Sequence, residues 1–327
     1  MKRRINTAVV GVGHLGGFHA QKYAGLKEQG IDLVALVEPR AEERSKKLAL
    51  PGVVWFTSIN EWLAAEASGK VPRAEAVSIA TTTDQHCNVG LQLLAAGKHI
   101  LVEKPLASSL AEGEKLVAAA RKANCWLATG QVERHRVVQL YKELKGKPRF
   151  IECHRLSSFP ARSTDIDVVM DLMIHDIDLM LALVDSPIVS VHASGFPVLT
   201  KQADIANARF EFANGCVANL TSSRISMQRT RKFRIFSGDS YLSLDLASGA
   251  FEQYRKDPEE QDLAKAISHA SGNLHVEDPL RAEILDFADA IREGRPPLVT
   301  GEDGLRAMEA ADKVIQDINQ RLRKFQP

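Results

Sequence analysis

The chain has 327 residues, 45% of them hydrophobic and 25% charged, which is typical of a globular protein long enough for about two domains. The formal net charge of +1 gives no reason to expect nucleic acid or a membrane surface as a partner, and no stretch approaches the roughly 18 apolar residues of a membrane span, so we expect a cytoplasmic protein. The four cysteines form no CxxC pair, which argues against a disulfide frame and against a metal site.

The first 125 residues alternate short apolar runs with helical patterns. The basic first residues precede an apolar run that is too short for a signal peptide, so this run is predicted to be a strand. Strands that alternate with helices indicate parallel βαβ units and hence a doubly wound parallel sheet. Asp84 and Ser109 are expected to cap two helices, and Gly97 to end one. The predicted strands are 6–10, 33–37, 53–56, 76–79, 99–102 and 126–129, and the predicted helices are 17–29, 42–48, 84–96 and 111–123.

The pattern changes in the second half of the chain, where repeated strands with tight turns follow an apolar helix that carries acids and one histidine. Asn214-Gly215 is a strong signal for a hairpin turn, and Gly238-Asp239 separates two further predicted strands. The expected elements are a helix over 165–184, strands within 188–254, a polar loop or loose helix over 258–272, and amphipathic helices over 279–292 and 303–322.

These patterns predict an α/β protein of two domains. The first domain, residues 1–125, is a Rossmann-type doubly wound sheet. The second domain, residues 126–327, is α+β, with a large, mostly antiparallel open sheet, and its C-terminal helix could pack back on the first domain. One face of that sheet has no obvious covering helix, which favours pairing with another subunit in a homodimer or homotetramer.

A glycine-rich loop lies between the first predicted strand and the first predicted helix. Its glycines suit a tight turn, close approach of the backbone to a pyrophosphate, and close packing of helix on strand. The N-terminus of the following helix favours phosphate groups. The loop therefore predicts a dinucleotide site formed by Gly11, Gly13, His14, Leu15 and Gly16.

An acidic residue, Glu38, stands at the end of the second predicted strand, 22 residues after Gly16. An acid at this place accepts hydrogen bonds from the adenosine ribose hydroxyls. A carboxylate there repels a 2′-phosphate, which favours NAD over NADP. Arg40 leaves NADP open, because an arginine can accept that phosphate or stack on the adenine.

Three further segments resemble the Gfo/Idh/MocA oxidoreductase family. They are Glu103-Lys104-Pro105 after a predicted strand, residues 130–134 with the sequence GQVER at the exit from the first domain, and residues 171–178 with the sequence DLMIHDID early in the second. With the glycine loop and the stretch 297–305, the resemblance covers essentially the whole chain. It implies an enzyme, an NAD(P)-dependent oxidoreductase that acts on CH–OH groups.

The residue types in these segments suit the oxidation of a secondary alcohol. His175 can act as the base for the hydroxyl proton, and Asp171, four residues earlier on one helix face, can orient the imidazole or bind a substrate hydroxyl. Lys104 can stabilise negative charge on the reacting oxygen. The resemblance implies the same catalytic roles for Lys104, Asp171 and His175. It also implies a cis peptide bond before Pro105.

The resemblance further places Thr81, His86, Glu103, Lys104 and Pro105 in the cofactor site. The threonine could instead only cap the following helix. Asp176 and Asp178 are expected to be structural. Many relatives have the sequence ERFNP where this chain has Glu133-Arg134-His135-Arg136, and the extra positive charge either faces an anionic substrate or is solvated.

Three stretches, 11–23, 165–183 and 204–226, are similar to a narrower group in the family, the UDP-N-acetylglucosamine 3-dehydrogenases. That similarity implies oxidation of the sugar 3-hydroxyl to a ketone, which an aminotransferase then converts to an amine for lipid A. A nucleotide sugar carries a diphosphate, which arginines bind well, although each of these arginines could simply be solvated. The candidate substrate-binding residues are Arg134, Arg155 and Arg224, with Arg162, Arg229, Arg231 and Arg234 as further arginines of the same region.

Two alternatives stay open. A free-sugar or inositol dehydrogenase would need no arginine cluster. An inactive NAD-binding regulatory protein would keep the fold and lose the chemistry, but the retention of Lys104 and His175 argues against it.

Overall fold

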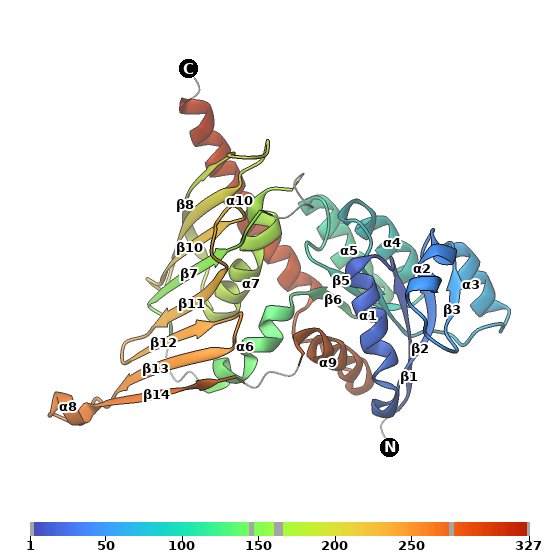
Figure 1. Ribbon diagram of the computed structural model, residues 1–327, viewed down its shortest axis with the longest axis horizontal. Helices are drawn as coiled ribbons and strands as arrows, with labels where there is room; N and C mark the ends of the chain where they lie inside the picture. The colour runs from blue at the N-terminus through green and yellow to red at the C-terminus, as the bar shows by residue number, and fades with distance from the viewer. Residues whose placement is uncertain (1–2, 144–146, 160–165, 275–277, 326–327) are drawn as a thin grey trace. The chain divides into compact units, whose positions relative to one another are not determined.

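The computed structural model describes residues 3–143, 147–159, 166–274 and 278–325. The chain divides into two compact units (Figure 1). Unit 1 comprises residues 1–135 and 277–305, and unit 2 comprises residues 136–276 and 306–327. The predicted boundary after residue 125 is too early, because the strand Leu127–Gly130 pairs with the strand His99–Glu103 inside unit 1.

Unit 1 is built on a six-stranded parallel sheet in the order β3-β2-β1-β4-β5-β6. From β1 to β3 the chain proceeds toward one edge of the sheet, and from β4 to β6 it proceeds toward the opposite edge. Because parallel crossovers are right-handed, the connecting helices lie on opposite faces, as predicted for a doubly wound sheet. The strands are β1 Ile5–Val10, β2 Ile31–Val37, β3 Val54–Phe56, β4 Ala76–Ile79, β5 His99–Glu103 and β6 Leu127–Gly130.

The helix ends in unit 1 test the predicted caps. Ser109 is the N-cap of its helix and accepts a hydrogen bond from the amide of Glu112, as predicted. Asp84 lies inside the first turn rather than at the cap, where Thr82 stands. Gly97 has a φ of 70° just after the same helix, as predicted. The helices are α1 His14–Ala24, η1 Lys27–Gln29, α2 Ala41–Lys47, α3 Ile59–Ala67, which was not predicted, α4 Thr83–Ala95, α5 Leu110–Ala123 and α9 Pro279–Glu293.

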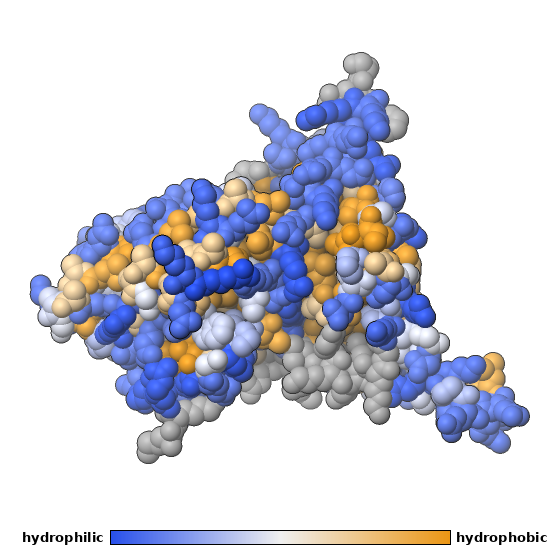
Figure 2. Space-filling model, turned by 180° about the vertical axis from the view of Figure 1, so that it is seen from behind, coloured by the Kyte–Doolittle hydropathy of each residue, from blue (hydrophilic) through white to orange (hydrophobic). Residues whose placement is uncertain are grey.

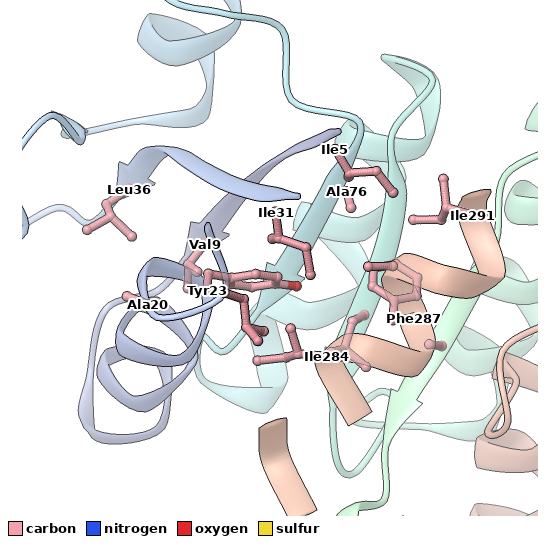
Figure 3. Packing of buried hydrophobic residues seen from close by; sticks show 14 of the residues in the cluster. Ile5, Val9, Ala20, Tyr23, Ile31, Leu36, Ala76, Ile284, Phe287 and Ile291 are labelled. Atoms are coloured by element: carbon pink, nitrogen blue, oxygen red, sulfur yellow. The ribbon is translucent and has the colours of Figure 1, made fainter. Parts of the chain in front are cut away.

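Helix α9 returns from late in the sequence to the core of unit 1. Figure 3 shows Ile284 and Phe287 of α9 packed near Tyr23 of α1, next to Ile31 of the sheet. Burying each large apolar side chain contributes roughly 1.5–3 kcal/mol, so the apolar face of α9 holds it to this unit. The expected packing of a C-terminal helix on the first domain is thus seen for α9, the penultimate helix. The first residues of the last helix, 301–305, also belong to unit 1, where Gly301 lies against Leu127.

Unit 2 contains an eight-stranded sheet in the order β14-β13-β12-β11-β7-β10-β9-β8. Strands β7 and β10 pair in parallel, and the other neighbours pair antiparallel, which confirms a mostly antiparallel sheet. The predicted hairpin turn is present between β9 and β10, where Gly215 has a φ of 80°. The strands are β7 Phe150–Leu156, β8 Ile188–Phe196, β9 Ile205–Phe212, β10 Val217–Ser223, β11 Thr230–Phe236, β12 Ser240–Asp245, β13 Ala250–Lys256 and β14 Ile267–Asn273.

The prediction of a loop or loose helix over 258–272 holds only for its first part, where a four-residue helix, α8 Leu263–Ala266, follows a loop. It was wrong for residues 267–272, which belong to β14 and pair with β13 at the edge of the sheet. Every residue of β14 is exposed, so the strand has no buried face and its sequence shows no period of two. Figure 2 shows this hairpin, at the lower right, as a largely hydrophilic projection.

The two faces of the sheet in unit 2 differ. One face is buried, and the helices α7 Ile174–Leu183 and α10 Gly301–Phe325 pack against it. The other face is mixed rather than uniformly apolar: a row of rings crosses it from β7 to β14, and the next row is polar, with Arg234 paired to Glu152. The rings of the row are Phe150, Phe236, Tyr241, Tyr254 and His269, with neighbouring centroids 4.6 to 6.2 Å apart.

The helices of unit 2 include α7 Ile174–Leu183 and α10 Gly301–Phe325, which begins in unit 1. Helix α6, Val132–Glu143, crosses the unit boundary. The helix predicted over 165–184 is shorter: it begins with a π-helical turn, η2 Val169–Met173, and residue 165 lies outside the described residues. Within the described parts of the chain, no helix has the length and hydrophobicity to cross a membrane.

Candidate active site

The glycine loop joins β1 to α1 at the point where the strand order reverses, between β1 and β4. Ligands of doubly wound sheets bind at this point, beyond the carboxyl ends of the strands. Gly11 has a φ of 83°, and a Cβ on it would lie 2.7 Å from the amide nitrogen of Thr81. A Cβ on Gly16 would overlap the carbonyl oxygen of Gly11. Both positions therefore require glycine, one for the turn and one for the packing of α1 on the loop.

The remaining glycine of the loop, Gly13, and the two residues that follow it face outward. Gly13 is the N-cap of α1, and a Cβ there would meet no heavy atom of the described residues within 4 Å. The first turn of α1 contains no acid, and its first residues, His14 and Leu15, are exposed. This end of α1 can therefore take a pyrophosphate close to its backbone and on the positive end of the helix dipole.

Glu38 follows β2 and is 7% exposed. Its Oε2 accepts a hydrogen bond from the amide of Val12 at 2.9 Å, and its Oε1 lies 3.6 Å from Nε of Arg40. The side chain of Arg40 is 61% exposed. The carboxylate thus holds the glycine loop with one oxygen and accepts from the backbone amide of Arg40 at 3.3 Å with the other. These features fit a dinucleotide, which Gly11, Gly13, Gly16 and Glu38 would hold.

Lys104 and Pro105 directly follow β5. The peptide bond between Lys104 and Pro105 is cis, as the resemblance implied. His86 of α4 is buried and lies between two carbonyl oxygens, with Nδ1 3.0 Å from that of Pro105 and Nε2 3.3 Å from that of Thr81. Burial lowers the pKa of His86 despite both carbonyls. His86 thus lies between the loops that follow β4 and β5.

Glu103, which the resemblance places in the cofactor site, ends β5 and is buried. Its Oε1 lies 2.8 Å from Nε2 of His19 on α1. His19 was missed by the sequence analysis. Its position three residues after Gly16 places it on the inner side of α1, and a buried histidine beside a glycine loop was the available signal.

Asp171 and His175 lie in unit 2 and are both half-buried. Asp171 is within the π-helical turn, where the amide of Ile174 donates to the carbonyl of Val169, and His175 is the second residue of α7. Asp171 therefore precedes His175 across a widened turn, not across the regular α-helical turn that was predicted. Short π-helical segments within helices are frequent at functional sites.

The three arginines expected to bind substrate have acidic partners. Arg155 forms a two-pronged ion pair with Asp176, at 2.7 and 3.0 Å, and both side chains are buried. Arg224 is fully buried, with Nε 2.8 Å from Oδ1 of Asp204. We assign both pairs to the packing of unit 2 and leave these arginines out of the proposed substrate site. The pairing of Asp176 also fits its expected structural role.

The positive run after Glu133 is not a free cationic patch. Arg134 is 8% exposed and lies 3.2 Å from Asp303. Burial lowers the pKa of His135 to about 4, so this ring is neutral at pH 7. Arg136 donates to the carbonyl oxygen of Leu246 at 2.5 Å. The structure thus accounts for these side chains by contacts within each unit, and Arg162 lies outside the described residues.

Two family models match the chain. The model described as an oxidoreductase family with an NAD-binding Rossmann fold matches residues 5–131, and that of the GFO/IDH/MocA C-terminal domain matches residues 142–240. These matches confirm the resemblance that the EKP and DxxxHD segments indicated.

The chain is 37% identical over 312 residues to a UDP-N-acetylglucosamine 3-dehydrogenase of Acidithiobacillus ferrooxidans, which covers 95% of this chain and 96% of that protein. The solved structure of UDP-N-acetylglucosamine 3-dehydrogenase GnnA from the same organism superposes with a TM-score of 0.86 over 97% of this chain and 98% of that one, at 36% identity. A levoglucosan dehydrogenase in complex with NADH and levoglucosan has a TM-score of 0.83, 97% and 98% coverage and 18% identity, and so shares the fold.

Proposed function

Because this chain belongs to the Gfo/Idh/MocA family of oxidoreductases with an NAD-binding Rossmann fold, we propose that it oxidises the 3-hydroxyl of a UDP-N-acetylhexosamine to a 3-keto sugar. NAD is the cofactor of this Rossmann unit. The observation that carries the proposed substrate is the 37% identity to a UDP-N-acetylglucosamine 3-dehydrogenase over 95% of the chain. The glycine loop and Glu38 support NAD binding by their geometry.

In the proposed mechanism, the chain's own residues handle the proton of the reacting hydroxyl. His175 takes that proton as general base, and Asp171 orients the imidazole or binds a neighbouring hydroxyl. Lys104 donates a hydrogen bond to the oxygen on which negative charge develops. NAD, when bound, accepts the hydride that leaves the same carbon. Thr81 and the His86–Pro105 contact shape the pocket for its nicotinamide end.

The diphosphate of the substrate needs cationic partners. With Arg155 and Arg224 assigned to buried ion pairs, Arg229 and Arg231 become the better candidates. Arg229 is exposed and precedes β11. Arg231 is half-buried and lies opposite Arg155 in the register of β11 and β7, which places Arg231 on the helix-covered face. A guanidinium that is not fully buried can reach a phosphate at low desolvation cost.

We further propose that the product feeds an aminotransferase. A 3-keto group is the substrate that such an enzyme converts to a 3-amine, here for a lipid A precursor made in the cytoplasm. We also propose a homodimer or homotetramer formed through the open face of the sheet in unit 2, where the row of rings is only partly covered.

The catalytic roles are tested by Lys104→Ala and His175→Ala. Each should lower kcat by roughly 10²–10⁴-fold while the Kd for NAD stays near that of the wild type, because a positioned acid or base contributes that much. Stopped-flow NADH absorbance and isothermal titration calorimetry measure the two quantities. Lys115→Ala and His192→Ala, at exposed positions, are the matched controls. Retention of more than a tenth of wild-type turnover in both variants would remove these residues from the reaction.

The substrate is tested by NAD reduction with UDP-N-acetylglucosamine, UDP-glucose, glucose and myo-inositol in parallel. We expect turnover with the first compound and a ketone at its carbon 3, identified by NMR. Activity confined to glucose or inositol would make the protein a free-sugar dehydrogenase. Normal NAD binding without turnover of any alcohol would favour the regulatory alternative.

A further inference from the structure

We propose that His19 is a positioning residue for Lys104, acting through the carboxylate of Glu103. This inference rests on the proposed catalytic role of Lys104. All of its contacts lie within unit 1. His19 belongs to the helix that begins at the glycine loop, whereas Glu103 ends the strand that leads into the lysine segment. The pair thus joins the dinucleotide-binding helix to the segment that carries the lysine.

Glu103 is held on three sides. Its Oε1 bonds with Nε2 of His19 at 2.8 Å, and its Oε2 accepts from the backbone amide of Lys104 at 3.3 Å. On the third side, a Cβ on Gly130 would lie 3.1 Å from the carboxylate, so the backbone of β6 closes the space. A shift of this carboxylate would therefore move the backbone amide of Lys104, and with it the Cα that carries the lysine side chain.

His19 is in turn fixed by a chain of hydroxyl groups. Its Nδ1 lies 3.1 Å from Oγ of Ser78, and that oxygen lies 2.8 Å from the hydroxyl of Tyr23. The chain is satisfied when Tyr23 donates to Ser78, Ser78 donates to Nδ1, and Nε2 donates to Glu103. His19 and Tyr23 are each 1% exposed, and Figure 3 shows Tyr23 enclosed by apolar side chains. The imidazole therefore has a single orientation, with its Nε2 proton aimed at Glu103.

Several titratable groups lie around Glu103. His19 faces it from α1, and Lys104 follows it directly after the end of β5. The charge of Glu103 also acts on His86 of α4, and Glu283 faces the cluster from α9. The ligand-type atoms of His19, Glu103 and Glu283 lie within 4.8 Å of one another, but His19 and Glu103 already bond to each other, so we interpret the group as a hydrogen-bonded cluster. Burial raises the pKa of Glu103, but the hydrogen bond with His19 and the neighbouring charge and amide of Lys104 more than reverse this and leave the pKa of Glu103 below its ordinary value.

This balance makes the proposal distinguishable from a purely structural role. Without His19, burial is opposed by fewer groups, so Glu103 takes up a proton at higher pH. As the pH falls, the negative charge beside Lys104 is then neutralised at a higher pH than in the wild type. The acidic limb of the pH profile of kcat/KM therefore moves to higher pH. A merely structural histidine would lower activity at all pH values together with thermal stability, and would leave the limb in place.

The experiment compares His19→Leu with His19→Gln, whose amide nitrogen can restore a donor to Glu103. We expect His19→Leu to lower kcat by about 10- to 100-fold, as for a lost hydrogen bond to a buried charged group, and to shift the acidic limb upward, with NAD affinity changed by less than about threefold. His19→Gln should return both the rate and the limb toward wild type. Lys98→Met, which breaks the buried ion pair with Glu66 near the start of the same strand, controls for loss of a buried polar contact.

Glu103→Gln covers the case in which His19→Leu does not fold, since it keeps an acceptor but removes the titrating charge. We expect this variant to have a low kcat and no acidic limb from this group. The proposal is overturned if the acidic limb of the pH profile stays in place in both His19→Leu and Glu103→Gln, or if His19→Gln fails to restore the rate. Lys104→Ala, measured in the same series, separates a failure of the proposed function from a failure of the positioning role of His19. If it remains active, the proposed function fails, whereas an inactive Lys104→Ala beside an unchanged His19→Leu profile rejects the positioning role alone.

Discussion

At the scale of single residues, one carboxylate has two tasks. Glu38 accepts from the Val12 amide with one oxygen and from the Arg40 amide, at 3.3 Å, with the other. The spacing from Gly16 predicted that Glu38 stands at the end of the second strand, because the loop and the strand end are set by local sequence. The hydrogen bond to Val12 was not predictable, since it depends on the side chain turning back toward the loop. A carboxylate fixed in this way cannot easily turn aside for a 2′-phosphate.

We therefore expect Glu38→Ala to relax the discrimination against NADP. The ratio of kcat/KM for NAD to that for NADP should fall by about tenfold or more, because a like-charge repulsion is removed and Arg40 becomes available to the phosphate. Steady-state kinetics with both cofactors measure the ratio. Glu43→Ala, an exposed acid on α2, is the matched control. An unchanged ratio would exclude Glu38 from the ribose site.

At the scale of elements, the loop between β8 and β9 is organised by one buried acid. Asp204 Oδ2 accepts from the amides of Val198, Leu199 and Thr200 at 2.6 to 2.9 Å, and Oδ1 accepts from Arg224. The arginine follows β10, so the contact ties the start of β9 to the end of β10. The same explanation applies to Arg155 and Asp176, which join β7 to α7. Charge alone could not reveal these partners, because each pair is distant in sequence.

The buried pair makes Arg224 a stability residue. We expect Arg224→Met to lower the free energy of unfolding by about 3–5 kcal/mol, because it leaves the carboxylate of Asp204 buried without its cation. Urea denaturation followed by circular dichroism measures the change. Arg209→Met, in an exposed ion pair on β9, is the control and should change stability little. Equal effects of the two substitutions would contradict the structural assignment.

The same carboxylate predicts a pH dependence. Burial raises the pKa of Asp204, but three amides and Arg224 outweigh it and hold the pKa well below its usual range. A depressed pKa contributes stability that is present above the ordinary carboxyl pKa of about 4 and is lost as the pH falls below it. Acid unfolding monitored from pH 6 to pH 2 should therefore be less steep in Asp204→Asn than in the wild type. An identical slope would show that other acids dominate the acid limb.

At the scale of the whole molecule, the open face of the sheet in unit 2 carries the proposed assembly. The row of rings offers apolar area, and the neighbouring charges, such as Arg234 with Glu152, would limit pairing to one register. Tyr254→Glu places a charge in this row, so we expect a smaller assembly than in the wild type. Light scattering coupled to gel filtration measures the mass, and Tyr254→Phe is the matched control. A mass unaffected by the glutamate would place the interface elsewhere.

By itself the sequence determined the features that depend on nearby residues. The loop from Gly11 to Gly16, the cap at Ser109, the hairpin at Asn214-Gly215 and the family segments around Lys104 and His175 each show a local pattern with a direct physical cause. Only the tertiary structure decided which distant groups meet. It paired Arg155 and Arg224 with buried acids, brought α9 back to α1, added β14 to a sheet edge where no face is buried, and joined His19 to Glu103. Burial in the folded chain makes these pairings necessary, and no spacing along the chain encodes it.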